Sequence, residues 1–219
     1  MREPTVADVM TRATVTAAPD TTFSEIVSAL IDTGASALPV IDPAGRLIGV
    51  VDEADVLAKL EFRCGTDARP LLAGAQTRAR WRKSSATTAA DLMTAPATTI
   101  GAEAPLSAAM RSLACAQLRQ LCVVDHTDLL VGVLARPDAL RLFLRSDAAI
   151  KADIEELAVG ARYGADDVTV QVSAGIVTLD GTLALRSTVE HAGRTACGVP
   201  GVVAIHNNLR FEFDDQMCT

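Results

Sequence analysis

The chain has 219 residues, 49% of them hydrophobic, and a formal net charge of -7 at pH 7. That length allows one large domain or two to three small ones with buried cores. Aromatic residues make up only 3%, and the charge is negative, so a broad nucleic-acid surface, which needs stacking rings and clustered cations, is disfavoured. No apolar run reaches the length of a signal-peptide core or a membrane span, and a cytoplasmic location is expected.

The chain repeats itself at an offset of 83 residues. Between residues 7 and 57 the two copies align without a gap, with 15 identities in 51 positions. The clearest matches are ADVMT at 7–11 with ADLMT at 90–94, and VID at 40–42 with VVD at 123–125. Such self-similarity indicates one structural unit used twice.

The first copy predicts a β-α-β-β-α unit. An extended segment over 14–17 opens it, and a helix follows, with Thr22 and Glu25 as a capping box and Gly34 at its end. The apolar face of this helix is expected to be Phe23, Ile26, Val27, Leu30 and Ile31. The runs ALPVI and LIGVV around the turn DPAGR predict a strand hairpin, and a last helix begins near Asp52.

The second copy repeats this order. Pro105 stands at the start of its long helix, where a missing amide costs little, and the last helix begins near Pro137. Its apolar stripe is Leu106, Ala109, Met110, Leu113 and Ala114. Cys115 and Cys122 are expected to be buried as small hydrophobic residues. Neither copy can bury so small a sheet alone, so the two are expected to pack about a pseudo-two-fold axis.

From about Ser146 the pattern changes. Ile150, Ile154 and Leu157 predict a helix. Strict alternation of Val168, Val170 and Val172 predicts a strand, and Gly175 a turn into a second strand. A helix over about 186–197 and a strand in which Val203, Ile205, Leu209 and Phe211 alternate with their neighbours complete a small layer. The fold class of the whole chain is α+β.

The ordered motifs DVMT, LPVID and GVVDEADVL, with their second-copy counterparts, resemble the paired CBS domains of a Bateman module. VTVQVSAGIVTLDG, a helix and GVPGVVAIHNNL resemble a BON domain, found in bacterial osmotic-stress and secretin-associated proteins. The domains predicted are CBS 1 at 1–60, a basic linker at 61–87, CBS 2 at 88–144, BON at 146–213 and a tail at 214–219. Ala174 stands where the BON turn commonly has Asp or Asn, so the turn type is expected to differ.

The CBS resemblance implies an adenosyl ligand, AMP, ATP or S-adenosylmethionine, in a cleft between the copies. The candidate residues are Thr16, Ala37, Pro39, Gly49 and Asp55 in the first copy and Thr99, Gln120, Cys122, Gly132 and Asp138 in the second. The hydroxyl that the family pattern places three residues before the acid is replaced by Asp52 and by Ala135. Asp52 would cap the helix amides itself and repel a phosphate, so the second copy is the better candidate. Asp55 and Asp138 are equally explained as first-turn acids.

The linker between the copies is basic, with a local charge of +4 over 61–87. Its candidate polyanion contacts are Arg78, Arg80, Trp81, Arg82 and Lys83. A solvated linker whose Trp81 packs onto the CBS pair is the favoured interpretation, with nucleic-acid binding as the alternative.

Catalysis is not predicted. His126, His191 and His206 share no motif, no metal-ligand spacing is present, and no nucleotide-hydrolysis or Rossmann pattern occurs. The prediction is a non-catalytic regulatory or sensory protein, with a ligand-free scaffold as the alternative. CBS pairs imply a homodimer, and the BON domain implies contact with an unknown protein partner or an envelope component. Residues 145–219 carry 6 basic and 11 acidic side chains, which disfavours attachment to anionic lipid.

Overall fold

The computed structural model describes residues 3–12, 14–67, 74–159 and 168–216. It forms two compact units, one from Thr5 to Arg136 and one from Pro137 onward. Helices and strands are mixed in both, and the sheets have two or three strands, so the predicted α+β class is confirmed.

The first copy has the predicted order of elements. These are η1 (Val6–Asp8), α1 (Phe23–Thr33), β1 (Ala37–Ile41), β2 (Leu47–Asp52) and α2 (Glu53–Glu61). The capping box is confirmed, because Thr22 accepts from the amide of Glu25 and its own amide donates to the Glu25 carboxylate at 2.9 Å. Gly34 ends α1 with φ +64°. One inward residue was predicted wrongly: Ile31 is 74% exposed, because it lies at the edge of the apolar stripe centred on Ile26 and Leu30.

The second copy repeats that order. It contains α4 (Ala89–Leu92), β3 (Thr99–Gly101), α5 (Leu106–Cys115), β4 (Gln120–Val124), β5 (Leu130–Ala135), α6 (Arg136–Leu140) and η3 (Arg141–Leu144). Leu106, Ala109 and Leu113 of α5 are buried, and so is Cys122, as predicted. Ala114 of the predicted stripe and Cys115 are exposed, and both predictions were wrong. Cys115 follows the buried Leu113 by two residues, which turns it to the other side of the helix.

The two copies pair through reciprocal contacts. Thr11 of the first copy bridges to Val133 of the second, and Thr94 of the second bridges to Val50 of the first. Each residue of one bridge lies 83 positions from its counterpart in the other. The opening segment of each copy therefore packs on the strands of the other copy.

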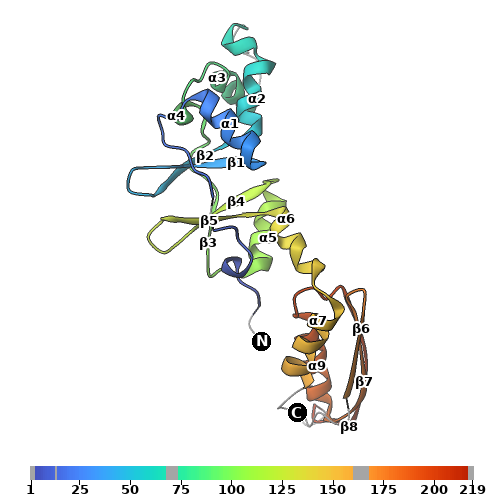
Figure 1. Ribbon diagram of the computed structural model, residues 1–219. Helices are drawn as coiled ribbons and strands as arrows, with labels where there is room; N and C mark the ends of the chain where they lie inside the picture. Colours follow the sequence, from blue (N-terminus) through green and yellow to red (C-terminus); the bar gives the residue numbers. More distant parts are fainter. Residues whose placement is uncertain (1–2, 13, 68–73, 160–167, 217–219) are drawn as a thin grey trace. The chain divides into compact units, whose positions relative to one another are not determined.

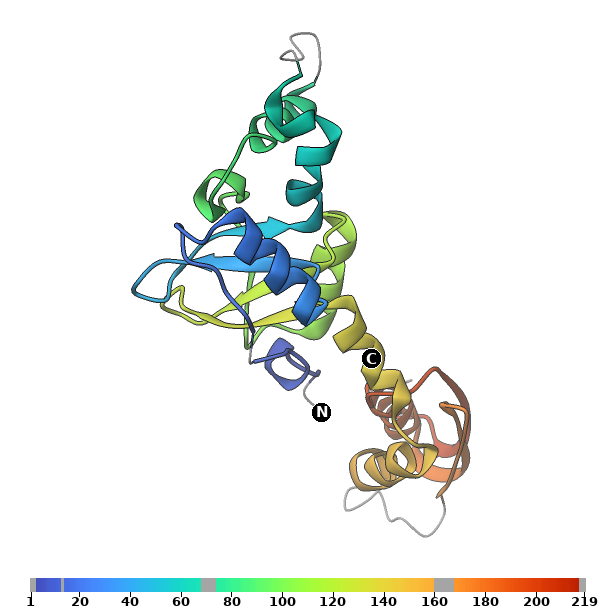
Figure 2. The same cartoon turned by 45° about the horizontal axis from the view of Figure 1, so that its top comes forward.

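Residues on the axis contact their own equivalents. Arg46 pairs with Leu129, and the side-chain amide of Gln120 donates to the carbonyl of Ala37 at 2.9 Å. Both pairs are 83 positions apart, so the predicted pseudo-two-fold packing is confirmed. Figure 2 shows the β1–β2 and β4–β5 hairpins side by side along this axis.

The linker contains ordered helices. These are η2 (Arg63–Gly65) and α3 (Ala75–Lys83), and α3 packs against α2. The ammonium of Lys59 on α2 donates to the carbonyls of Ser84 and Ala86 at 3.2 and 2.6 Å, and Ser84 is fully buried. The end of the linker is thereby fixed to the last helix of the first copy.

The second unit carries a three-stranded sheet. Its elements are α7 (Asp147–Ile154), the π-helical turn η4 (Glu155–Val159), β6 (Val168–Ser173), β7 (Ile176–Leu185), α9 (Arg186–Cys197) and β8 (Ala204–Phe213). β6 and β7 form a hairpin, and β8 returns through α9 to lie parallel to β7. Helices α7 and α9 cover one face of the sheet (Figure 1), where Ile150, Ile154 and Leu179 lie in the core.

Three apolar residues of the patterns that predicted this helix and strand are exposed: Leu157, Val203 and Phe211. Leu157 lies in the π-helical turn, whose wider winding shifts the face that continues α7. Val203 precedes β8, and Phe211 lies where β7 and β8 run on beyond the last β6 pairing at Gly181.

The turn between β6 and β7 is a two-residue turn at Ala174 and Gly175. Ala174 and Gly175 both have positive φ, 52° and 75°, as a type I′ turn requires. The carboxylate of Asp147, at the start of α7, accepts from both amides at 2.9 Å. A side chain distant in sequence replaces the local help of Asp or Asn, so the expected change of turn type was wrong.

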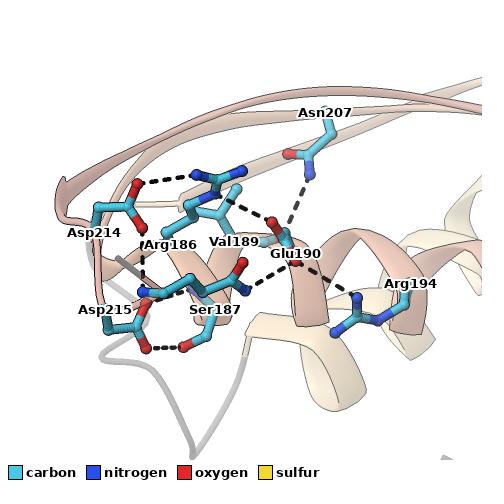
Figure 3. A network of polar contacts seen from close by, with 9 residues as sticks. Arg186, Ser187, Val189, Glu190, Arg194, Asn207, Asp214 and Asp215 are labelled. Carbon is cyan, nitrogen blue, oxygen red and sulfur yellow. Dashed lines mark hydrogen bonds and ion pairs between the residues drawn. The ribbon is translucent and has the colours of Figure 1, made fainter. Parts of the chain in front are cut away.

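The tail closes the start of α9, as Figure 3 shows. Leu185 has no capping side chain, and instead the Asp215 carboxylate accepts from the amide and hydroxyl of Ser187 at 3.0 and 2.5 Å. These hydrogen bonds lower the pKa of Asp215. Arg186 pairs with Asp214 at 2.9 Å, and Gln216 donates to Glu190, so the predicted tail packs on α9 up to the last described residue. Cys218 lies outside the described residues.

Candidate ligand site between the two repeats

A cavity of about 310 Å³ lies between the repeats at one end of their axis. It is lined by Ser36, Ala37, Val50, Asp52, Glu53, Ala54, Leu57, Gln117, Leu118, Arg119 and Gln120. Two predicted ligand residues, Ala37 and Gln120, meet here across the axis. The guanidinium of Arg119 reaches the Glu53 carboxylate at 2.5 Å, and both side chains are largely exposed. The cavity combines apolar walls with a few polar groups, which is typical of small-molecule sites.

A second cavity, of about 450 Å³, lies by the hairpin turns. It is lined by Asp42, Arg46, Leu47, Ile48, Pro96, Ala97, Thr99, Val124 and Asp128. Among the predicted ligand residues it includes Thr99. The Asp42 carboxylate accepts from the amides of Ala44 and Arg46, and these hydrogen bonds, with that of Arg46 the largest cause, lower its pKa. Asp42 is thus already satisfied by its own turn.

Three further predicted residues lie in the strand layer. Thr16 is partly buried in the opening segment, and the Pro39 carbonyl accepts from Ala17 at 2.9 Å. Cys122 pairs with Thr99 across β3 and β4, and burial raises the pKa of its thiol to about 11. The two described cavities together include three of the ten predicted ligand residues, and they do so at opposite ends of the axis.

The two predicted glycines have a packing role. A Cβ on Gly49 would lie 2.6 Å from the sulfur of Met93, and a Cβ on Gly132 would lie 2.7 Å from the carbonyl oxygen of Thr11. Met93 and Thr11 belong to the DLMT and DVMT segments that cross onto the other copy. Gly49 and Gly132 therefore permit the close approach on which the paired fold depends.

Asp52 caps α2, as its sequence position predicted. Its carboxylate accepts from the amide of Asp55 at 2.9 Å, and its own amide donates to the Asp55 carboxylate at 3.2 Å. A negative group now occupies the helix end that would otherwise attract phosphate. The start of α2 is acidic, with Asp52, Glu53 and Asp55 in sequence.

Asp55 is buried and paired with a residue of the linker. The ammonium of Lys83 lies 2.5 Å from its carboxylate and 2.7 Å from the hydroxyl of Thr94. The side chains of Lys83 and Asp55 are only 14% and 10% exposed. Burial raises the pKa of Asp55, and the hydrogen bond from Lys83 opposes that rise. Sequence reasoning missed this pair and named Lys83 only as a candidate for polyanion contact.

Asp138 is also buried, with a partner of another kind. Its carboxylate accepts from the guanidinium of Arg141 at 2.7 Å, three residues along the chain. The Arg141 side chain is 70% exposed. An exposed, flexible partner costs little to displace.

The other predicted basic contacts divide into two groups. Arg80 pairs with Glu61, and the indole N–H of Trp81 donates to the carbonyl of Asp67 at 3.0 Å. Arg78 and Arg82 are exposed on α3. Arg69, which contributed to the predicted linker charge, lies outside the described residues. Helix α3 packs against α2 of the first copy, whereas this hydrogen bond of Trp81 is made within the linker and not to the CBS pair.

These features define the class of the protein as a pair of α+β repeats around a pseudo-two-fold axis with a small α+β domain after it. The CBS domain model matches residues 6–61 and 89–145, and the BON domain model matches residues 146–212. The chain therefore belongs to the CBS-domain family, with two CBS domains followed by a BON domain. Proteins with paired CBS domains are generally regulatory modules.

Solved CBS pairs share the fold. CBSX2 in complex with AMP is 27% identical with a TM-score of 0.55, over 64% of this chain and 96% of that chain. CBSX2 from Arabidopsis thaliana is 28% identical with a TM-score of 0.51, over 65% and 96% of the two chains. The CBS pair of MJ0100, in complex with 5′-methylthioadenosine and S-adenosyl-L-methionine, is 22% identical with a TM-score of 0.50, over 65% and 97%, and shows the fold alone.

A curated relative matches a shorter stretch. The uncharacterised protein MJ1426 of Methanocaldococcus jannaschii is 38% identical over 55 residues, which is 25% of this chain and 33% of that protein. The match thus spans about a third of the curated relative.

Two negative findings concern the described parts of the chain. None of their helices is long and apolar enough to cross a bilayer. No group of three or more histidine, cysteine, aspartate or glutamate side chains that could hold a metal ion occurs in those same ranges.

Proposed function

We propose that this protein is a non-catalytic regulator whose CBS pair binds an adenosyl ligand between its copies. The observation that carries the proposal is the paired fold with cavities of about 310 and 450 Å³ between the repeats. The likeness to CBSX2, which was crystallised with AMP, supports adenosine chemistry. The second copy is the proposed binder, because Asp52 places a carboxylate at the phosphate position of the first copy while Ala135 adds no repulsion.

Isothermal titration of the full chain with adenosine, AMP, ATP and S-adenosylmethionine tests this function. Binding of at least one of them is expected, and Asp138→Ala should abolish it. Asp32→Ala, which removes an exposed acid of α1 outside both cavities, is the matched control and should bind as the unaltered chain does. No heat and no thermal shift with any of the four would leave the ligand-free scaffold as the function.

We propose a homodimer formed through the last helices of both CBS copies. Leu57 and Leu60 are 53% and 78% exposed, and their equivalents 83 positions on, Leu140 and Phe143, are 64% and 57% exposed. Retention of exposed apolar side chains at the same positions of both copies favours an interface. Light scattering should give a dimer, and Leu60→Glu with Phe143→Glu should give a monomer. Val203→Glu, at an equally exposed site in the BON domain, should leave the dimer intact.

We propose that the BON domain contacts a partner protein or an envelope component. Opposite α7 and α9, the sheet has a hollow of about 600 Å³ lined by Asp180, Gly181, Thr182, Asn208 and Arg210. This lining is polar and of mixed charge, which suits hydrogen-bonded recognition better than lipid insertion. In co-sedimentation the full chain should stay in solution with anionic and with neutral vesicles, and pelleting with anionic vesicles alone would oppose this proposal.

A further inference from the structure

The linker places a positive charge inside the first CBS copy. Lys83, the last residue of α3, bonds to Asp55 on α2 and to Thr94 of the second copy at 2.5 and 2.7 Å. One ammonium therefore connects α2, the end of α3 and Thr94 at the start of the second copy. Only 14% of the Lys83 side chain is exposed, whereas Arg78 and Arg82 on the same helix are exposed to solvent.

Asp55 and Thr94 are groups that a ligand hydroxyl could use. A carboxylate accepts from a hydroxyl, and a threonine hydroxyl donates or accepts. In this chain the ammonium of Lys83 is hydrogen-bonded to both the Asp55 carboxylate and the Thr94 hydroxyl. The cavity of about 310 Å³ next to it is lined by Asp52, Glu53 and Ala54 but does not reach Asp55.

The pair is held by more than its own attraction. Lys59 bonds to the carbonyls of Ser84 and Ala86, directly after Lys83, and Trp81 anchors the helix to Asp67. Asp52 and Asp55 cap the same helix reciprocally, so the carboxylate cannot turn away without losing those hydrogen bonds. A ligand would have to break several contacts to displace Lys83.

We propose that Lys83 is a built-in occupant of the first CBS site and restricts the pair to one adenosyl ligand per chain. The inference rests on the proposed function, because it concerns the same pair of sites. Lys83 is then a specificity-determining residue that closes one copy, while the second copy stays available.

The test is the number of adenosine molecules bound per chain, measured by isothermal titration. Adenosine is the probe because it carries no phosphate that Asp52 would repel. The unaltered chain should bind one molecule, and Lys83→Met should bind two. Lys83→Gln, whose side chain is neutral and one bond shorter, weakens the contacts to Asp55 and Thr94; it is the milder variant if Lys83→Met fails to fold, and it should also bind two. Arg82→Gln, on the exposed side of the same helix, should bind one.

The outcomes separate this inference from the proposed function. Two molecules bound by the unaltered chain, or an unchanged number in both folded Lys83 variants, would overturn the inference and leave the proposed function standing. Absence of adenosine binding to the unaltered chain would contradict the proposed function. If the unaltered chain bound no adenosine but a Lys83 variant did, the proposed role of Lys83 as an occupant of the site would still be supported. If the Lys83 variants also bound none, that role would be contradicted.

Discussion

The two CBS copies carry the same acid in the same place and neutralise it differently. Asp55 is paired with Lys83, a buried residue of the linker, whereas Asp138 is paired with Arg141, an exposed residue of its own chain segment. The repeat preserves the carboxylate, and the partner comes from sequence that the repeat does not include. Two copies of the same sequence repeat can thus differ in how accessible the equivalent carboxylate is.

The largest expected effect removes the buried partner. Lys83→Met leaves the Asp55 carboxylate buried without compensation, which should cost about 3 kcal/mol of unfolding free energy. Arg141→Met removes an exposed partner from Asp138 and should cost less than about 0.5 kcal/mol after solvent screening. Urea denaturation of both variants measures the difference. If Lys83→Met and Arg141→Met lowered the free energy of unfolding by similar amounts, the proposed difference between the two acid pairs would be contradicted.

The double variant Lys83→Met with Asp55→Asn is the control for this prediction. Removal of both charges leaves no buried ion, so much of the loss should be regained. If the double variant were as unstable as Lys83→Met alone, packing of the lysine stem and not its charge would hold the linker.

A second difference between the copies lies in the strand layer. Cys122 occupies the position of Pro39, 83 residues earlier, and only the cysteine can titrate. Because its folded pKa, about 11, exceeds the ordinary value of 9.0, the native state keeps a proton that the unfolded chain releases. This contribution to stability is complete below pH 9 and is lost as the pH rises to 11, by about 2–3 kcal/mol.

Comparison with Cys122→Ala isolates that term. The variant loses packing at every pH but should lack this part of the alkaline decline, so the gap between the two stability curves should narrow from pH 9 to 11. Parallel curves would contradict the buried thiol. Exposed Cys64, Cys115 and Cys197 should react with a thiol reagent before Cys122 does.

Most of the fold follows from local and periodic signals. The 83-residue offset predicted the pseudo-two-fold packing, and the capping boxes at Thr22 and Asp52 lie where the sequence placed them. What the sequence hid are contacts between distant segments. Lys83 reaches Asp55 across 28 positions, and Asp147 serves the turn at Ala174 across 27. The first contact depends on how α3 packs against α2, and the second on how α7 packs against the β6–β7 hairpin. The spacing of residues along the chain does not predict either packing.

The smallest expected difference concerns the two glycines under the crossing segments. Gly132→Ala should cost roughly 1–2 kcal/mol, since its new methyl group meets the Thr11 carbonyl, a backbone atom held by the Val133 amide at 2.9 Å. Gly49→Ala should cost less than about 1 kcal/mol, because its methyl meets the Met93 side chain, which can rotate away. Urea denaturation of the two variants side by side is the measurement. A greater loss at Gly49 would mean that the Met93 thioether is fixed more rigidly than the Thr11 backbone, and the reciprocal contacts would then differ in strength as well as in their atoms.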